Sequence, residues 1–321
     1  MPAPRALRVV ALEMLKDGRS ASRKLAADAD PDTLHDFRVA LRRLRSWLRT
    51  FEPELAGAAR RKERHRLRDI ARVTNANRDA DVQLAWLAAA GKGFRRNRRA
   101  GADWLARYLE AKSADRALDA KTLARFEKVA ANLEAELNTF PQPVKRSNGG
   151  ETLAAVMAAH IVPHTDTLGR ELQQIQSVHD EYRVHEARIA AKRLRYLVEP
   201  AVPFVKKGDD ILKSLKSLQD ELGALHDAHV IGREIGVALA EAATADSART
   251  IAQALGQNAP ATAVSALLLT APRDGLLAIA ERVREDADRA FAAVSKDWRH
   301  GQYPRFARRM TTFARHLGAL R

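Results

Sequence analysis

The sequence predicts an all-α protein built from two similar helical bundles. Ala, Leu and Arg are abundant, runs of β-branched residues are short, and apolar residues recur with a period near 3.6 along most of the 321 residues. A second observation is an internal repeat, because HDFRVALRRLR at 35–45 resembles HEARIAAKRLR at 185–195. We therefore expect one bundle in residues 5–140 and a pseudo-two-fold-related one in 151–318, joined by a linker at 141–150.

The first half is expected to contain a series of short helices. Asp30 is a suitable N-cap before Pro31 at the first helical position, and Pro53 should end this second helix and open a third, cation-rich one. Residues 91–93, with two glycines, break the pattern. The helices are expected at about 6–26, 31–52, 53–76, 79–90, 100–112 and 114–138.

The second half is expected to repeat this order after the linker PQPVKRSNGG. Pro200 and Pro203 should interrupt it after the helix that carries His185. Asn75 and Gly223 occupy corresponding positions, and both residue types tolerate the conformation that ends helices, so each half is expected to turn a corner there. The helices are expected at about 151–176, 185–198, 209–224 and 227–241, with more towards the C-terminus.

Each repeated segment carries a histidine followed by cations at +3, +7 and +10. Steps of three, four and seven residues keep side chains on one face of an α-helix, so each segment has a basic stripe beside its apolar face. Arg43 and Arg193, at +8, are expected to point elsewhere. The first stripe comprises His35, Arg38, Arg42, Arg45 and Arg49, and the second comprises His185, Arg188, Lys192 and Arg195.

The like charges within a stripe repel one another by a few tenths of a kcal/mol per pair. Neither stripe has carboxylates interspersed among its cations at these spacings, and Glu199, at the end of the second stripe, is the exception. The stripes therefore predict an anionic partner, since solvated faces, the alternative, normally alternate in sign.

A second basic helix in each half is expected to extend the same surface. RDADV at 78–82 matches HDAHV at 226–230, which aligns the helices before them. Salt bridges to nearby carboxylates are the alternative role for their cations, and Asp79 and Asp227 are expected to be helix caps or arginine partners. The residues expected to bind are His65, Arg68, Arg72, Lys213 and Lys216, with Arg43, Arg78, Arg193 and His226 as additional candidates.

The charge of the chain favours an anionic partner but does not identify it. The formal net charge is +15, and residues 1–150 contain 32 Lys and Arg against 19 Asp and Glu, whereas residues 151–321 contain 23 against 21. Such a surface attracts nucleic acid, polyphosphate or acidic membranes. There is no cysteine, no apolar run long enough to span a bilayer and no secretory signal core near the start, so we expect a cytoplasmic protein.

The repeated segments, together with SLKSLQDELGALHDAHV at 214–230, resemble the CHAD (conserved histidine α-helical) domain family over roughly residues 5–318. The resemblance implies two pseudo-symmetric helical bundles around a basic groove or pore that binds inorganic polyphosphate, and association with polyphosphate granules. Asn75 departs from the family, which tends to have glycine there. The family's basic residues carry over onto His35, Arg38, Arg42, Arg45, His185, Arg188, Lys192, Arg195 and Lys216.

The two stripe histidines could instead be metal ligands, phosphohistidines or general bases. Neither histidine has a carboxylate or a second histidine at i+3 or i+4, and each has an arginine at i+3 instead. The chain also contains no Gly-rich phosphate loop or kinase signature. We expect both to donate hydrogen bonds to phosphate, with no catalytic residue, metal or cofactor, in a protein that acts as a monomer.

Three functions remain from the sequence. The first is non-catalytic polyphosphate binding. The second is weak, non-specific nucleic-acid binding, although an aromatic content of 5% leaves few platforms for base stacking and no helix-turn-helix signature is evident. The third is a polyphosphate-processing enzyme, which would normally require carboxylates to hold Mg²⁺.

Overall fold

The computed structural model describes residues 2–28, 30–55, 57–113, 120–139, 151–256 and 267–320, except the side chains of residues 31, 75–81, 97, 113 and 300. Across these ranges the chain is helical almost throughout and forms no strand, which confirms the all-α prediction. None of the helices in this part of the chain has both the length and the apolar character needed to cross a membrane. The predicted linker, residues 141–150, lies outside the described residues.

Each half of the chain consists of a series of helices. The first half contains α1 (Ala3–Ala27), α2 (Pro31–Thr50), α3 (Glu52–Leu55), α4 (Arg61–Gly91), α5 (Arg96–Ser113) and α6 (Ala120–Asn138). The second half contains α7 (Leu153–Gln174), α8 (Glu181–Val198), the 3₁₀ helix η2 (Glu199–Phe204), α9 (Gly208–Ala254), α11 (Arg273–Ala293), the π-helix η3 (Val294–Gln302) and α12 (Tyr303–Gly318).

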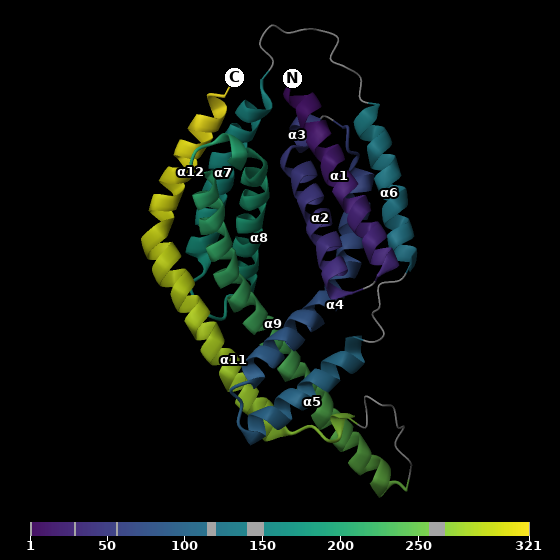
Figure 1. Ribbon diagram of the computed structural model, residues 1–321. Coiled ribbons are helices and arrows are strands. Elements are labelled where there is room, and N and C mark those ends of the chain that lie inside the picture. Colours follow the sequence, from purple (N-terminus) through teal and green to yellow (C-terminus); the bar gives the residue numbers. More distant parts are fainter. Residues whose placement is uncertain are drawn as a thin grey trace.

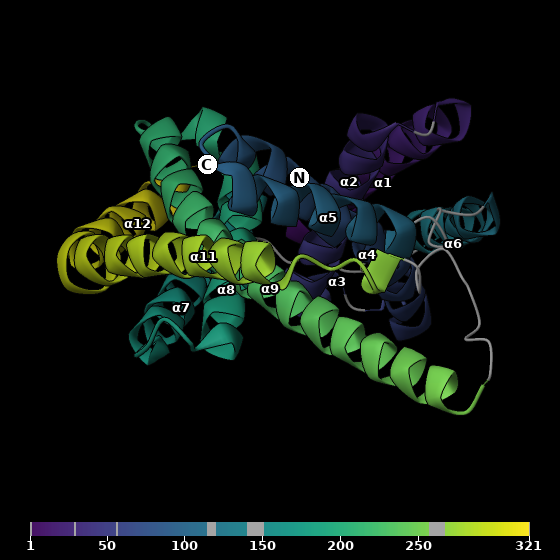
Figure 2. The same cartoon turned by 90° about the horizontal axis from the view of Figure 1, so that it is seen from below.

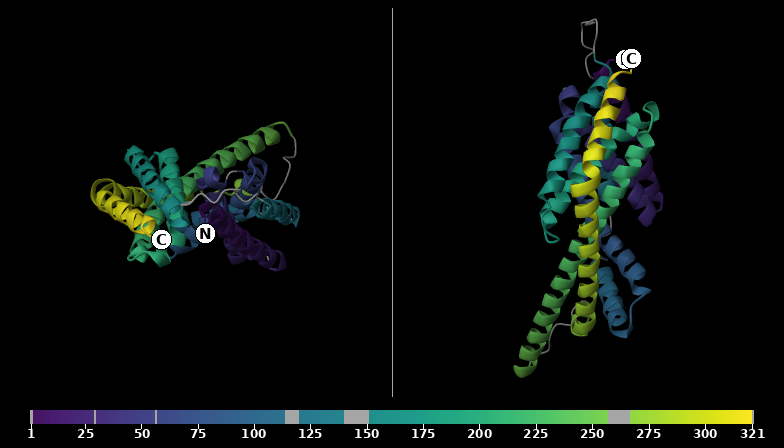
Figure 3. Two further views of the ribbon diagram at one scale, coloured as in Figure 1. Left: turned by 90° about the horizontal axis from the view of Figure 1, so that it is seen from above. Right: turned by 90° about the vertical axis from the view of Figure 1, so that its left-hand side faces the viewer.

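The helices form two groups that meet at α2 and α8. In Figure 1, α1, α2 and α6 lie on one side with the beginning of α4, and α7, α8 and α12 lie on the other with the beginning of α9. Below them α4 and α9 cross, and α5 of the first half packs on α11 of the second (Figure 2). The side view shows the molecule as elongated, with the far end of α9 projecting from it (Figure 3). This arrangement places the two helices that carry the basic stripes side by side.

Local sequence explains where α2 begins and how it docks. The carboxylate of Asp30 accepts hydrogen bonds from the backbone N–H groups of Asp32 and Thr33 at 2.6 and 2.9 Å, which confirms it as the N-cap. The indole of Trp47 donates to the carbonyl of Leu7 at 3.0 Å, and Phe37 packs edge-on against Phe126. These contacts bury the apolar face of α2 and fix the direction of its basic stripe.

The prediction of corners at Asn75 and Gly223 is wrong. The backbone continues as helix through both positions, so the expected helices at 53–76 and 79–90 are one helix from Arg61, and those at 209–224 and 227–241 are parts of α9. A glycine in a helix interior costs about 1 kcal/mol relative to alanine. At Gly223 tertiary packing outweighs this cost, because the residue is buried and lies close to Arg188 on α8.

Pro53 does not open the cation-rich helix, contrary to expectation. It lies in the single-turn helix α3, and the chain turns again through Gly57, whose φ of +88° strongly favours glycine, before α4 begins. The other expected helices appear with shifted ends, and the break at Pro200 and Pro203 takes the form of η2. Most of the buried apolar side chains form one continuous cluster that includes residues of both halves.

Candidate functional site

A pocket of about 450 Å³ opens between α2 and α8, and we call it the central pocket. Its walls come from the stripe faces of these two helices, while α4 contributes Val82 and α9 contributes His226 and Asp227. The lining residues are Arg38, Arg42, Arg45, Ser46, Arg49, Val82, His185, Arg188, Ile189, Lys192, Arg193, Tyr196, His226 and Asp227.

The cations of the central pocket lie close enough to disfavour one another's charge. Burial lowers the pKa of Arg45, and the neighbouring guanidiniums of Arg42, Arg68, Arg49 and Arg193 lower it further. Burial followed by repulsion from Arg49 likewise lowers the pKa of Arg193, although Glu186 partly opposes this effect. The pocket is therefore a region of concentrated positive potential to which cations of both halves contribute.

His226 lies among cations at the α9 side of the central pocket. Its ring is 5.4 Å from that of His185, and its Nδ1 atom is buried without a hydrogen-bond partner in the structure. Burial, followed by repulsion from Arg188, His185, Lys192 and His229, lowers the pKa of His226 to about 3. The imidazole is therefore neutral near pH 7 in the unliganded protein, and a bound anion would favour its protonation.

The structure brings most of the predicted stripe residues together in the central pocket. From the two stripes these are Arg38, Arg42, Arg45, Arg49, His185, Arg188 and Lys192. Of the additional candidates, His226 and Arg193 line it as well, so the expectation that Arg193 points elsewhere is wrong. The side chain of Arg78 lies outside the described residues.

Other predicted residues lie outside the central pocket. His35 is exposed one helical turn before Arg38, and Arg195 stacks its guanidinium over the ring of Tyr196 at 5.0 Å. Exposed positions outside this pocket are also taken by His65, Arg68, Arg72, Lys213 and Lys216. Asp227 lies inside α9 and therefore caps no helix, while the side chain of Asp79 is not described.

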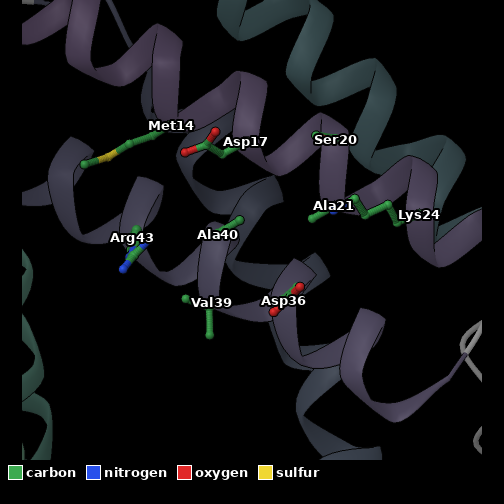
Figure 4. A pocket seen from close by; sticks show the side chains of 9 residues that line it. All are labelled: Met14, Asp17, Ser20, Ala21, Lys24, Asp36, Val39, Ala40 and Arg43. Carbon is green, nitrogen blue, oxygen red and sulfur yellow. The ribbon is translucent and has the colours of Figure 1, made fainter.

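Arg43 has a structural contact in place of a position in the central pocket. Its guanidinium pairs with Glu199 at 2.6 Å and so joins α2 to η2 across the two halves. Arg43 also lines a separate pocket between α1 and α2, together with Asp17, Lys24 and Asp36 (Figure 4). Charges of both signs line that pocket, which makes it a poorer anion site than the central one.

His65 and Arg68 line a neighbouring cavity of about 390 Å³ between α2 and α4, which we call the side pocket. The side pocket shares Arg45 and Arg49 with the central pocket. In the first half, the second basic helix therefore does lie beside the stripe of α2. The complete lining is Arg45, Leu48, Arg49, Glu52, Arg61, Arg64, His65, Leu67 and Arg68.

Comparison with known families settles what kind of chain presents this pocket. The family model of the CHAD domain matches residues 10–236, which include both stripes and His226. The chain belongs to the CHAD domain family. A comparison with curated proteins finds no match.

Two solved structures resemble this CHAD chain in fold. The crystal structure of the CHAD domain from the plant Ricinus communis is 20% identical with a TM-score of 0.56, and the alignment covers 100% of this chain and 93% of that one. PptA from Streptomyces chartreusis is 16% identical with a TM-score of 0.53, and the alignment covers 91% and 99% of the two chains. At these identities the likeness concerns the fold alone.

Sequence reasoning missed several residues of this CHAD site. Arg61 and Arg64 of the side pocket belong to an obvious cation cluster but show no repeated spacing. His160 and His164 on α7 line a further cavity with Arg49 and Arg193, and His160 pairs with Glu54 at 2.6 Å. Nothing in the sequence placed these two histidines beside α2.

The described side chains offer no group of three or more His, Asp and Glu residues that could hold a metal ion. In the central pocket the one carboxylate among the lining residues is Asp227. The donor set therefore fits a phosphate or another oxyanion better than a divalent cation.

Proposed function

We propose that this CHAD domain binds inorganic polyphosphate in the central pocket without catalysing its breakdown. The observation that carries the proposal is that the stripes on α2 and α8, 150 residues apart in sequence, line the same cavity. Polyphosphate binding is also the property that membership of the CHAD family implies. We also propose that the protein is located at polyphosphate granules, because it would bind the polymer that they contain.

The chemistry of the pocket suits a chain of phosphates. Arginine predominates among its cations, and the planar guanidinium can hold two phosphate oxygens at once. Polyphosphate has no bases to be recognised, so a row of cations is sufficient. Mg²⁺-dependent transfer of phosphoryl groups normally uses several carboxylates to hold the metal ions. The lining of the central pocket has one, Asp227, which supports a binding role.

Competition between ligands tests this function. We expect unlabelled long-chain polyphosphate to displace a labelled polyphosphate probe at much lower phosphate concentration than duplex DNA does, at equal ionic strength. Preferential displacement by DNA would identify a nucleic-acid-binding protein instead. Release of phosphate from polyphosphate on addition of Mg²⁺, measured in parallel, would identify an enzyme.

We expect binding of polyphosphate to strengthen as the pH falls below the pKa that His226 has in the complex. The unliganded pKa is about 3, and bound phosphates raise it, so the complex holds more protons than the free protein between the two values. By linkage, the affinity should then gain up to about tenfold per pH unit. Titrations between pH 5 and 8 check this.

The variant His226→Gln serves as the comparison for this pH dependence. It keeps a polar side chain but removes the titrating imidazole, so its affinity should vary less with pH than that of the wild type. The ligand's own titration is common to both proteins and cancels in their ratio. Identical pH profiles of the two proteins would show that His226 does not take up the proton.

A further inference from the structure

On the side of α4 the central pocket continues into a second cationic cavity. Arg45 and Arg49 line both the central pocket and the side pocket, so the two cavities meet at these residues. The guanidinium of Arg68, on the α4 wall of the side pocket, is among the charges that lower the pKa of Arg45. The positive potential is therefore continuous from one cavity to the other.

The corresponding surface of the second half is different. Lys213 and Lys216, which the repeat aligns with His65 and Arg68, are exposed on α9 and line neither pocket. Here α8 and α9 are joined directly, because the buried side chain of Gln219 donates a hydrogen bond to the carbonyl of Ala191 at 3.0 Å. Arg61, Arg64 and Arg68 therefore line a cavity next to the central pocket, whereas Lys213 and Lys216 do not.

The overall distribution of charge agrees with this asymmetry. Residues 1–150 carry a net charge of +13, whereas residues 151–321 carry +2. Part of the side pocket is neutralised internally, because Glu52 forms an ion pair with Arg64. Arg61 is exposed, and Arg68 is exposed with only a long contact of 3.8 Å to Asp69, so these two can turn towards a ligand.

We propose that a polyanion too long for the central pocket leaves it over the first half, past Arg45 and Arg49, and continues in the side pocket on Arg61 and Arg68. The cavity beside α7 shares Arg49 and Arg193 with the central pocket but is lined by no further Lys or Arg among the described residues. Its His160 pairs with Glu54, and burial lowers the pKa of its His164, so it offers a long polyanion less than the side pocket does. This inference rests on the proposed function, since it describes how the same ligand is held when its chain is long. Long chains would then be distinguished from short ones by their additional contacts with Arg61 and Arg68 on α4.

Two double variants of equal charge change test the path. Arg61→Ala with Arg68→Ala removes the cations of the side pocket, and Lys213→Ala with Lys216→Ala removes two cations from α9. All four side chains are exposed, so both variants should fold. Each is titrated with tripolyphosphate, which needs only the central pocket, and with long-chain polyphosphate, over a series of salt concentrations.

We expect the Arg61/Arg68 variant to lose about tenfold in affinity for long chains while its affinity for tripolyphosphate changes far less. Its logarithmic salt dependence with long chains should flatten by about 1.4, since each contact with a single-chain polyanion contributes about 0.7. The Lys213/Lys216 variant should match the wild type with both ligands.

Equal losses in the two double variants would overturn the inference, because they would show that long chains respond to net charge and not to a path. A parallel loss of tripolyphosphate affinity in the Arg61/Arg68 variant would also overturn it. The proposed function fails separately, if the wild type binds neither ligand. If the wild type binds long chains and the Arg61/Arg68 variant binds them equally well, the extension is refuted and the proposed function stands.

Discussion

The variant in which Arg42 and Lys192 are both replaced by alanine should lose more than about 100-fold in polyphosphate affinity at moderate salt. These residues lie on opposite walls of the central pocket, one on α2 and one on α8. A hydrogen bond to a charged group contributes about 1.5–3 kcal/mol, and every 1.4 kcal/mol corresponds to a factor of ten. The logarithmic salt dependence should flatten by about 1.4 as two phosphate contacts disappear.

The loss should not come from unfolding. Arg42 is one of the charges that disfavour the protonated form of Arg45, so its removal relieves repulsion within the folded protein. We therefore expect the free energy of unfolding to stay the same or rise slightly. Denaturant titrations of the unliganded variant measure this directly.

Arg308→Ala with Arg315→Ala is the matched control for that variant. Both arginines are exposed on α12, which lies at the outer edge of the molecule in Figure 1, away from α2 and α8. The control loses the same net charge and should retain nearly all of its affinity. If it loses as much as the Arg42/Lys192 variant, binding depends on overall charge and the central pocket is not the site.

Gly101→Ala should destabilise the protein by about 2–3 kcal/mol, against the expectation from helix propensity. In an isolated helix this substitution is favourable by about 1 kcal/mol. In the folded protein a Cβ atom at Gly101 would lie 2.5 Å from the carbonyl carbon of Gly275 and 2.9 Å from the backbone nitrogen of Leu276. Backbone atoms cannot rotate away, so α5 and α11 would have to separate.

Gly236→Ala provides the comparison for Gly101. Gly236 is exposed on α9, and no atom lies within 4 Å of a Cβ added there, so we expect this variant to be stabilised by about 1 kcal/mol. Urea unfolding of both variants gives the two free energies. A stabilised Gly101→Ala variant would mean that α5 and α11 do not approach as closely as the structure has them.

Periodicity in the sequence was enough to predict the helical class and the angular position of each cation about its own helix. It correctly set Arg38, Arg42 and Arg45 on one face of α2, because that angle depends only on residue spacing. It failed at Asn75 and Gly223, where turn-favouring residues lie inside α4 and α9. Propensity at one position is a small effect beside the packing of a long helix.

Residue spacing alone identifies the two basic stripes and the residues that compose them. The packing of the helices brings the stripes of α2 and α8 to one pocket, adds His226 and Arg193 to its lining, and leaves His35 and Lys216 outside it. The reason is physical: residue spacing fixes a side chain's direction from its own helix axis, whereas the neighbour it meets depends on how the apolar faces of all the helices pack. The asymmetry between the side pocket and the closed α8–α9 contact has the same origin.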